Sequence, residues 1–297
     1  VCSGYTARAE DIGTTASELD SLLASFPADT WSNAEKLYKK ILTGGAQTVK
    51  ELCLRVAPPS NGNDAPARFA IHGLVHYTAR SGSDKDRRMV ARTLAETLNT
   101  ATNPDVQDFM LEQLRFAADK DDIPSISKFL LLQETTSRAA AIMVNIGGKN
   151  GETALVEALP RAEGKCLAAI FKALGDLGSS ACIKECIDRM DKTTDTNLQR
   201  CILHALSRSG NQKAGEALKA RIKNQPAGIE SGEIVSAYLD FAERLAGIGE
   251  NKQANSIACE LLAGKGPVST AIRCRSLAIL GAAEDPATLQ TLIVSLN

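Results

Sequence analysis

Five glycines in the second half of the chain recur at a nearly constant spacing. They are Gly147, Gly178, Gly210, Gly249 and Gly281, separated by 31, 32, 39 and 32 residues. The residues four before, eight after and twelve after each glycine are all apolar, although apolar residues make up only 44% of the chain. A period of about 30–40 residues is typical of helical repeats. The spacing therefore predicts a series of similar structural units.

The apolar frame predicts that each unit is a helix, a turn and a second helix. The framing residues are Met143, Leu174, Leu206, Leu245 and Leu277, then Leu155, Cys186, Leu218, Ile257 and Leu289, then Leu159, Met190, Ile222, Leu261 and Ile293. We expect each glycine to end a first helix in the left-handed backbone conformation, which other residues avoid. The two later positions lie one turn apart on the second helix and face the first. A single unit cannot bury its stripe, so neighbouring units must stack.

Weaker copies of the frame extend toward the N-terminus, around Gly82 and Ala118. Thr78 interrupts the frame of the Gly82 copy, because it replaces the apolar residue four positions before the glycine. Upstream, the pattern predicts helices at about 13–26, 31–44 and 48–56. Residues 57–66 are rich in Pro, Asn and Gly, which predicts a loop.

Sustained alternation of apolar and polar residues, the sign of strands, is missing from the sequence. We therefore expect an all-α fold, a right-handed α-α superhelix of stacked helix–turn–helix units. A single repeat domain would span 10–297. Within it, 10–66 would form an irregular N-terminal cap and loop, and 67–297 would form six to seven repeats.

Two segments resemble known families. Residues 166–178 (CLAAIFKALGDLG) and 271–289 are similar to HEAT repeats, which implies a HEAT- or armadillo-like solenoid. Residues 49–80 look like the helical region that precedes 3-keto-disaccharide hydrolase domains in exported bacterial proteins. That resemblance implies a place beside carbohydrate processing. The hydrolase domain itself is a β-sandwich, so this chain would be its non-catalytic neighbour or a standalone relative.

Composition excludes several classes of function. The net charge is -1 and the pI is near 6.4, whereas nucleic-acid binders usually carry a basic excess. No apolar run reaches the ~18–20 residues that cross a bilayer. The sequence contains neither a Gly-x-Ser-x-Gly elbow nor a phosphate-binding loop. We therefore expect no catalytic residue and no cofactor.

Histidines are few. His72 and His76 are four residues apart, a spacing that lets two imidazoles of one helix bind a metal. Metalloproteases need Glu after the first His, and Gly73 stands there. HEAT-repeat hydroxylases hold iron with His-Glu pairs, and none of the three histidines is followed by Glu. With no third ligand evident, we expect a packed or surface pair and no metal site.

The loop at 58–68 is the strongest candidate for ligand binding. It carries Asn61, Asp64 and Arg68, close in sequence to His72. Loops held on rigid scaffolds often bind ligands. The alternative is that the loop merely covers the apolar edge of the first repeat.

The N-terminal residues predict export. Residues 1–9 end in Ala7-Arg8-Ala9, which resembles a signal-peptidase site, so 1–9 would be a signal-peptide remnant and the mature chain would begin near Glu10. A lipid anchor on Cys2 is an alternative. We expect an exported, periplasmic or cell-surface location. The eight cysteines show no Cys-x-x-Cys spacing, so we expect mostly buried thiols.

Second-helix positions expected to face solvent carry mixed charges and small side chains, which favours protein docking over binding to phosphate. The sequence therefore predicts a non-catalytic scaffold or protein-interaction module whose partner is a protein or an adjacent domain, with no nucleic acid and no transmembrane segment. Two alternatives stay open. One is an accessory domain of a 3-keto-disaccharide hydrolase-like enzyme, and the other is a small-molecule or sugar binder that uses the 58–72 loop.

Overall fold

The computed structural model describes residues 16–58, 62–224, 231–263 and 270–282. Every regular element within these ranges is helical, and none is a strand, which confirms the all-α prediction. The chain packs as two compact units, residues 1–146 and 147–297. The single domain over 10–297 stays a prediction, and the signal-peptide remnant at 1–9 lies outside the described residues.

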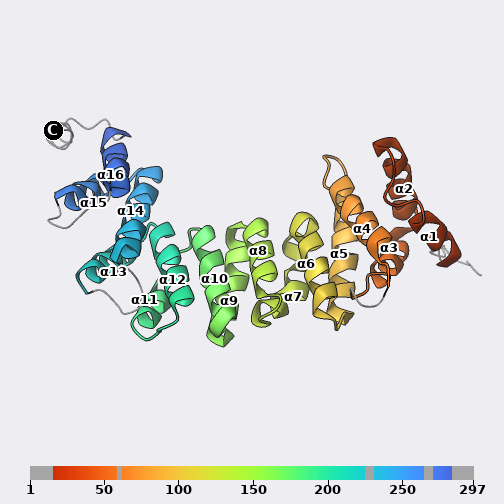
Figure 1. Ribbon diagram of the computed structural model, residues 1–297, viewed down its shortest axis with the longest axis horizontal. Helices are drawn as coiled ribbons and strands as arrows, with labels where there is room; N and C mark the ends of the chain where they lie inside the picture. The colour runs from red at the N-terminus through yellow and green to blue at the C-terminus, as the bar shows by residue number, and fades with distance from the viewer. Residues whose placement is uncertain (1–15, 59–61, 225–230, 264–269, 283–297) are drawn as a thin grey trace, which may run out of the picture. The chain divides into compact units, whose positions relative to one another are not determined.

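Unit 1 has two helical layers (Figure 1). Its helices are α1 (Ala16–Leu23), α2 (Trp31–Thr43), α3 (Gly45–Leu54), α4 (Ala65–Thr78), α5 (Asp84–Thr100), α6 (Pro104–Ala117), α7 (Ile123–Ile126) and α8 (Thr136–Ile146), with 3-10 turns at Lys120–Asp122 and Ser127–Leu131. The first layer contains α2, α4, α6 and α8, each packed on the next, and the second contains α3, α5 and α7. Leu74, Leu94 and Leu114 are fully buried in its core.

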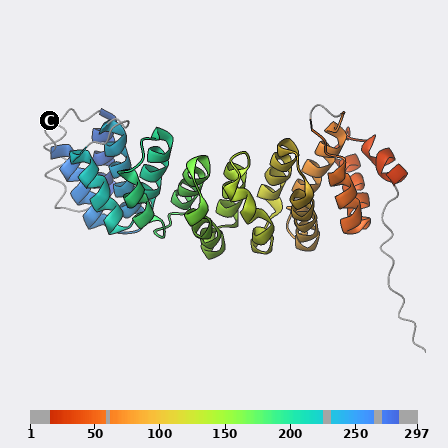
Figure 2. The ribbon, with the colours of Figure 1, turned by 90° about the horizontal axis from the view of Figure 1, so that it is seen from below.

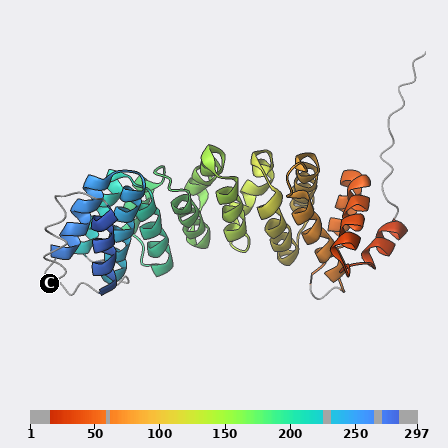
Figure 3. The same ribbon diagram turned by 90° about the horizontal axis from the view of Figure 1, so that it is seen from above.

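Unit 2 repeats this plan. Its helices are α9 (Gly148–Ala158), α10 (Gly164–Asp176), α11 (Ile183–Met190), α12 (Thr196–Arg208), α13 (Gln212–Lys223), α14 (Ser231–Gly247), α15 (Asn251–Ala263) and α16 (Thr270–Ala282), with a 3-10 turn at Leu159–Arg161. Helices α10, α12, α14 and α16 pack in sequence, and α11 packs on α13. Seen from below and from above, successive helix pairs within each unit lie side by side (Figures 2 and 3).

The predicted glycine turns are confirmed at four of the five anchors. Gly147, Gly178, Gly210 and Gly249 have φ of +66°, +66°, +64° and +89°, and each follows the end of one helix and precedes the next helix along the chain. The framing residues that the structure describes are buried, except Ile222 and Leu277, which are half-buried. Leu289 and Ile293 lie outside the described residues.

The prediction for Gly281 was wrong. Gly281 lies inside α16, without a positive φ. The buried stripe of α16 is Ser276, Ile279 and Leu280. Leu277 follows Ser276 and is therefore turned about 100° away from the centre of that stripe.

Asparagine and aspartate side chains begin several of these helices. The carboxamide of Asn103 accepts backbone N–H groups at the start of α6, and Asp195 and Asn211 do the same for α12 and α13. Such caps satisfy N–H groups that have no partner inside the helix. These caps fix where α6, α12 and α13 start.

The cysteines behave mostly as small apolar residues. Seven cysteines from Cys53 to Cys274 carry free thiols, and four of them are buried. Burial raises the pKa of Cys53 to about 12, so this thiol stays protonated at neutral pH. Cys182 and Cys186 are unbridged, as their spacing along one helix predicts.

Candidate functional site

The loop predicted at 58–68 ends earlier than expected, because α4 begins at Ala65. Two predicted site residues, Asp64 just before α4 and Arg68 within it, hold the base of this loop, and we call this pair the clasp. The Asp64 carboxylate accepts the Ala57 N–H at 3.1 Å and the Arg68 Nε–H at 2.6 Å. The Arg68 guanidinium also donates to the Ala57 carbonyl oxygen at 3.0 Å. Both backbone polar groups of Ala57 are therefore bound by the first turn of α4. Asn61 lies outside the described residues.

Arg68 also forms one wall of a groove on the first layer of unit 1. Its guanidinium lies 4.7 Å from the centroid of the Phe109 ring on α6, a cation–π contact. The groove has a volume of about 430 Å³. Its lining is Asp64, Arg68, Asp105, Asp108, Phe109, Glu112 and Arg138. Carboxylates thus outnumber guanidiniums by two, and the groove is acidic.

Arg138 of α8 also lines the groove and links α8 to α6. Arg138 binds Asp108 at 3.0 Å and also pairs with Glu112. These hydrogen bonds raise the pKa of Arg138, so its charge is permanent. The Asn145 amide donates to the Arg115 carbonyl at 2.9 Å further along the two helices. Residues 138 and 145 of α8 contact residues 108 and 115 of α6 in the same order along the chain, so α6 and α8 run parallel.

The two histidines of α4 lie next to the groove, on the side that faces α6. His72 Nδ1 is 3.1 Å from the Gln113 amide oxygen. The His76 ring lies 4.5 Å from the His72 ring and 4.9 Å from that of Phe116, centroid to centroid. Burial, and then the charge of His72, lowers the pKa of His76. Both imidazoles are nevertheless exposed at the surface.

Exposed phenylalanines extend this surface. Phe69 is 54% exposed and shares the outer stripe of α4 with His72 and His76, three and seven residues further on. Phe116 is 37% exposed, and the Arg115 guanidinium lies 4.9 Å from its ring centroid. We call Phe69, His72, His76 and Phe116 the aromatic–histidine patch. It lies on two parallel, adjacent helices.

Of the four residues of this patch, only His72 was predicted from the sequence to bind a ligand, and Phe69, His76 and Phe116 were not predicted as part of a binding surface. Six of the twelve aromatic residues of the chain lie on α2, α4 and α6. This uneven distribution, with Phe69, His72 and His76 at helical spacing, was the available signal. The aromatic content of the whole chain, 4%, does not reveal this local concentration.

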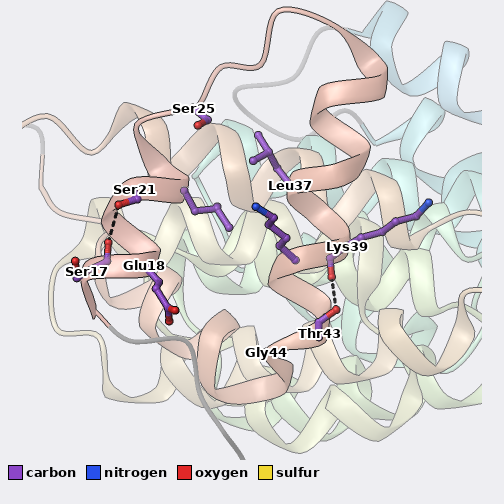
Figure 4. Close-up of a pocket in the computed structure, with 10 residues that line it drawn as sticks. Ser17, Glu18, Ser21, Ser25, Leu37, Lys39, Thr43 and Gly44 are labelled. Atoms are coloured by element: carbon purple, nitrogen blue, oxygen red, sulfur yellow. Dashed lines mark hydrogen bonds between the residues drawn. The ribbon is translucent and has the colours of Figure 1, made fainter.

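A larger hollow lies between α1 and α2 (Figure 4). Its volume is about 690 Å³, and three serines, two lysines and two leucines are among its lining residues. Its hydroxyl groups bond within their own helices, Ser21 to the Ser17 carbonyl at 3.0 Å and Thr43 to the Lys39 carbonyl at 2.8 Å. The Lys39 ammonium pairs with Glu35 at 3.0 Å. These groups are engaged within the chain, which makes this hollow the weaker candidate.

The mixed charges on the second helices of unit 2 largely pair with one another. Within α11, Lys184 pairs with Asp188 and Glu185 with Arg189. Lys219 of α13 pairs with Glu260 of α15 at 2.7 Å. These three pairs compensate part of the charge on this face.

Among the described residues, no three or more His, Cys, Asp or Glu side chains are clustered so that they could hold a metal ion. Across the same residues, no helix combines the length and apolarity needed to span a bilayer.

Comparisons with known proteins find similarity at the level of structure. No family model matches the chain, and neither does any curated protein. A crystal structure of an engineered protein is similar at 16% identity and a TM-score of 0.41, over 93% of this chain and 81% of that one. A second engineered protein aligns at 15% identity and a TM-score of 0.34, over 77% and 96%. Similarity this distant assigns no activity.

A chain from a structural study of a phosphorylation switch in the cadherin–β-catenin interaction is also similar. It shares 16% identity at a TM-score of 0.38, over 94% of this chain. This chain spans 62% of the length of that one. The interaction described there belongs to those proteins.

Proposed function

We propose that the chain is a non-catalytic helical-repeat module that binds a protein partner on the first layer of unit 1. The observation that carries this proposal is the aromatic–histidine patch. Phe69 and Phe116 expose much of their rings to solvent on adjacent helices, whereas Phe129 and Phe171 are fully buried. Exposed apolar side chains gathered in one place are characteristic of interaction surfaces.

The energetic argument concerns the two phenylalanine rings. Complete burial of a Phe side chain contributes about 1.5–3 kcal/mol, and these rings are already partly covered. Covering both would therefore contribute about 1–3 kcal/mol, enough for them to act as anchors of an interface. The helices beneath them are packed in register, so the anchors are pre-organised.

The neighbouring groove indicates the chemistry of the partner. Asp105, Asp108 and Glu112 lie on α6, on the same outer surface as Phe116. Arg68 and Arg138 are already bound to carboxylates of the chain. The excess acid is complementary to lysine or arginine. We therefore infer a partner segment that carries basic residues next to apolar ones, whose binding weakens as salt concentration rises.

Photo-crosslinking in cells that produce the protein tests the proposal. A photoreactive phenylalanine replaces Phe69 in one variant and Leu132 in another, since Leu132 is 43% exposed but lies outside the patch. We expect a discrete crosslinked protein from position 69 that Phe116→Ser abolishes, and no such product from position 132. The same products from both positions would refute a specific docking surface.

Three further proposals rest on the sequence alone. The first is export to the periplasm or cell surface. The second is an accessory role beside a 3-keto-disaccharide hydrolase-like catalytic domain, and the third is binding of a small molecule or sugar at the 58–72 loop. N-terminal sequencing and the intact mass of the native protein test export and the presence of a further domain. Sugar binding predicts a ligand-induced rise in melting temperature that Arg68→Ala removes.

A further inference from the structure

Two of the three histidines of the chain lie on successive turns of one exposed helix face. The His72 and His76 rings have a centroid separation of 4.5 Å, and both side chains reach the surface. Imidazole nitrogens bind Zn²⁺ at about 2.0–2.1 Å, so two rings that share one ion have centroids ~4.5–5.5 Å apart. The observed separation of the His72 and His76 rings lies at the lower end of that range.

A buried amide orients the first of these rings. Gln113 of α6 is only 2% exposed, and its amide oxygen lies 3.1 Å from His72 Nδ1. An amide oxygen can only accept, so His72 Nδ1 carries the proton and donates it. The lone pair of His72 is then on Nε2. Metal-binding histidines usually have this arrangement, with the second ring nitrogen donating to a fixed oxygen.

The second ring is held by packing. His76 lies against Phe116, 4.9 Å between centroids, and Phe116 lies on α6, as Gln113 does. Helix α6 therefore positions both rings of α4.

We propose that His72 and His76 together bind one divalent transition-metal ion through their imidazole nitrogens. Imidazole ligands suit Cu²⁺, Ni²⁺ and Zn²⁺ rather than Mg²⁺ or Ca²⁺. Two protein ligands leave the other positions on the ion to water. No metal was expected from the sequence, because a third ligand is not evident there and the contact of His72 with Gln113 cannot be read from it. This inference does not depend on the proposed partner.

Calorimetric titration of the full chain with Ni²⁺ tests the site, after accessible thiols such as that of Cys274 have been blocked with iodoacetamide. We expect one Ni²⁺ per chain, and His72→Gln or His76→Gln should each weaken the affinity at least ~10-fold. Gln113→Leu should weaken it roughly 10-fold with both ligands still present, as loss of an outer-shell partner typically does. Cu²⁺ should bind more tightly than Ni²⁺ and Co²⁺ less tightly.

The matched control is His204→Gln. His204 lies on α12 and pairs with Asp176 at 2.8 Å, so its replacement should leave Ni²⁺ affinity unchanged. A second readout is nuclear magnetic resonance, in which substoichiometric Ni²⁺ should broaden the imidazole signals of His72 and His76 and spare those of His204. Absence of saturable binding, or equal losses in His204→Gln and His76→Gln, would overturn the proposal. Because crosslinking from position 69 needs no metal, the two hypotheses fail independently.

Discussion

The phenol of Tyr38 on α2 occupies the space that a Cβ atom would need at Gly73 on α4. Tyr38 is buried, and its ring also contacts the ring of Tyr77 one turn further along α4. The Glu35 carboxylate accepts the Tyr77 hydroxyl at 3.3 Å, so α2 runs in the opposite direction to α4. Glycine at position 73 thus lets α2 cover one side of the helix that carries the aromatic–histidine patch.

Gly73→Ala should therefore destabilise the protein. An added methyl group in this contact forces the Tyr38 ring to move, which costs about 1–3 kcal/mol. Urea denaturation followed by circular dichroism measures the loss. In a Tyr38→Ala background the same substitution should cost nothing or stabilise slightly, because the obstacle is gone and alanine favours the helix. An equal loss in both backgrounds would contradict the steric account.

Gly178 is the second glycine whose replacement should be costly. Its φ is +66°, and a Cβ there would lie 3.1 Å from the Arg244 guanidinium and 3.4 Å from the Arg208 carbonyl oxygen. Gly178→Ala should lower the free energy of unfolding by about 1–2 kcal/mol. Gly247→Ala is the control, since a Cβ at the end of α14 meets nothing within 4 Å. Equal melting temperatures for Gly178→Ala and Gly247→Ala would contradict this prediction.

The clasp at the base of the 58–68 loop should protect one amide. Asp64→Ala removes the acceptor of the Ala57 N–H, and we expect hydrogen exchange of that amide to rise roughly tenfold or more. Asn63→Ala is the matched control, because the Asn63 side chain accepts from the Ala65 N–H instead. Unchanged exchange at Ala57 in Asp64→Ala would show that the clasp does not hold the loop.

Much of the fold follows from local features of the sequence. The glycines at 147, 178, 210 and 249 end helices in a backbone conformation with positive φ, which glycine adopts without steric cost. This preference belongs to the residue itself, so it can be predicted from the sequence. Apolar residues at helical spacing then identify the buried face. The prediction for Gly281 was wrong although Gly281 shares the spacing and the apolar frame of the other glycines, because α16 continues through it.

The candidate site was harder to predict because its contacts join successive repeats. Arg138 and Asp108 are 30 residues apart, and His72 and Gln113 are 41 apart. No local pattern specifies which residues meet at such separations. Asp64 and Arg68 were predicted from the sequence as ligand-binding residues, and that role stays a prediction. Their shared bond to Ala57 depends on the path of the loop, which composition does not determine.

Asp176 on α10 gives a stability prediction with a defined dependence on pH. Burial raises the pKa of Asp176, but hydrogen bonds from Lys172 at 2.7 Å and His204 at 2.8 Å outweigh it, and the net pKa is lowered. The ionised form is thus favoured in the folded state. Its contribution is complete above the unfolded pKa of about 3.9 and is lost as pH falls through the lower folded value.

Asp176→Asn should therefore lower the free energy of unfolding at neutral pH by about 0.5–1 kcal/mol, a small effect because the pair is partly screened by solvent. The difference from wild type should shrink as pH falls below about 3.9, since the wild-type carboxylate then loses its charge. Urea titrations at neutral and at acidic pH measure both values. Glu157→Gln, at an exposed carboxylate on α9, should show no such difference. A penalty for Asp176→Asn that is the same at both pH values would mean that packing, rather than charge, makes Asp176 stabilising.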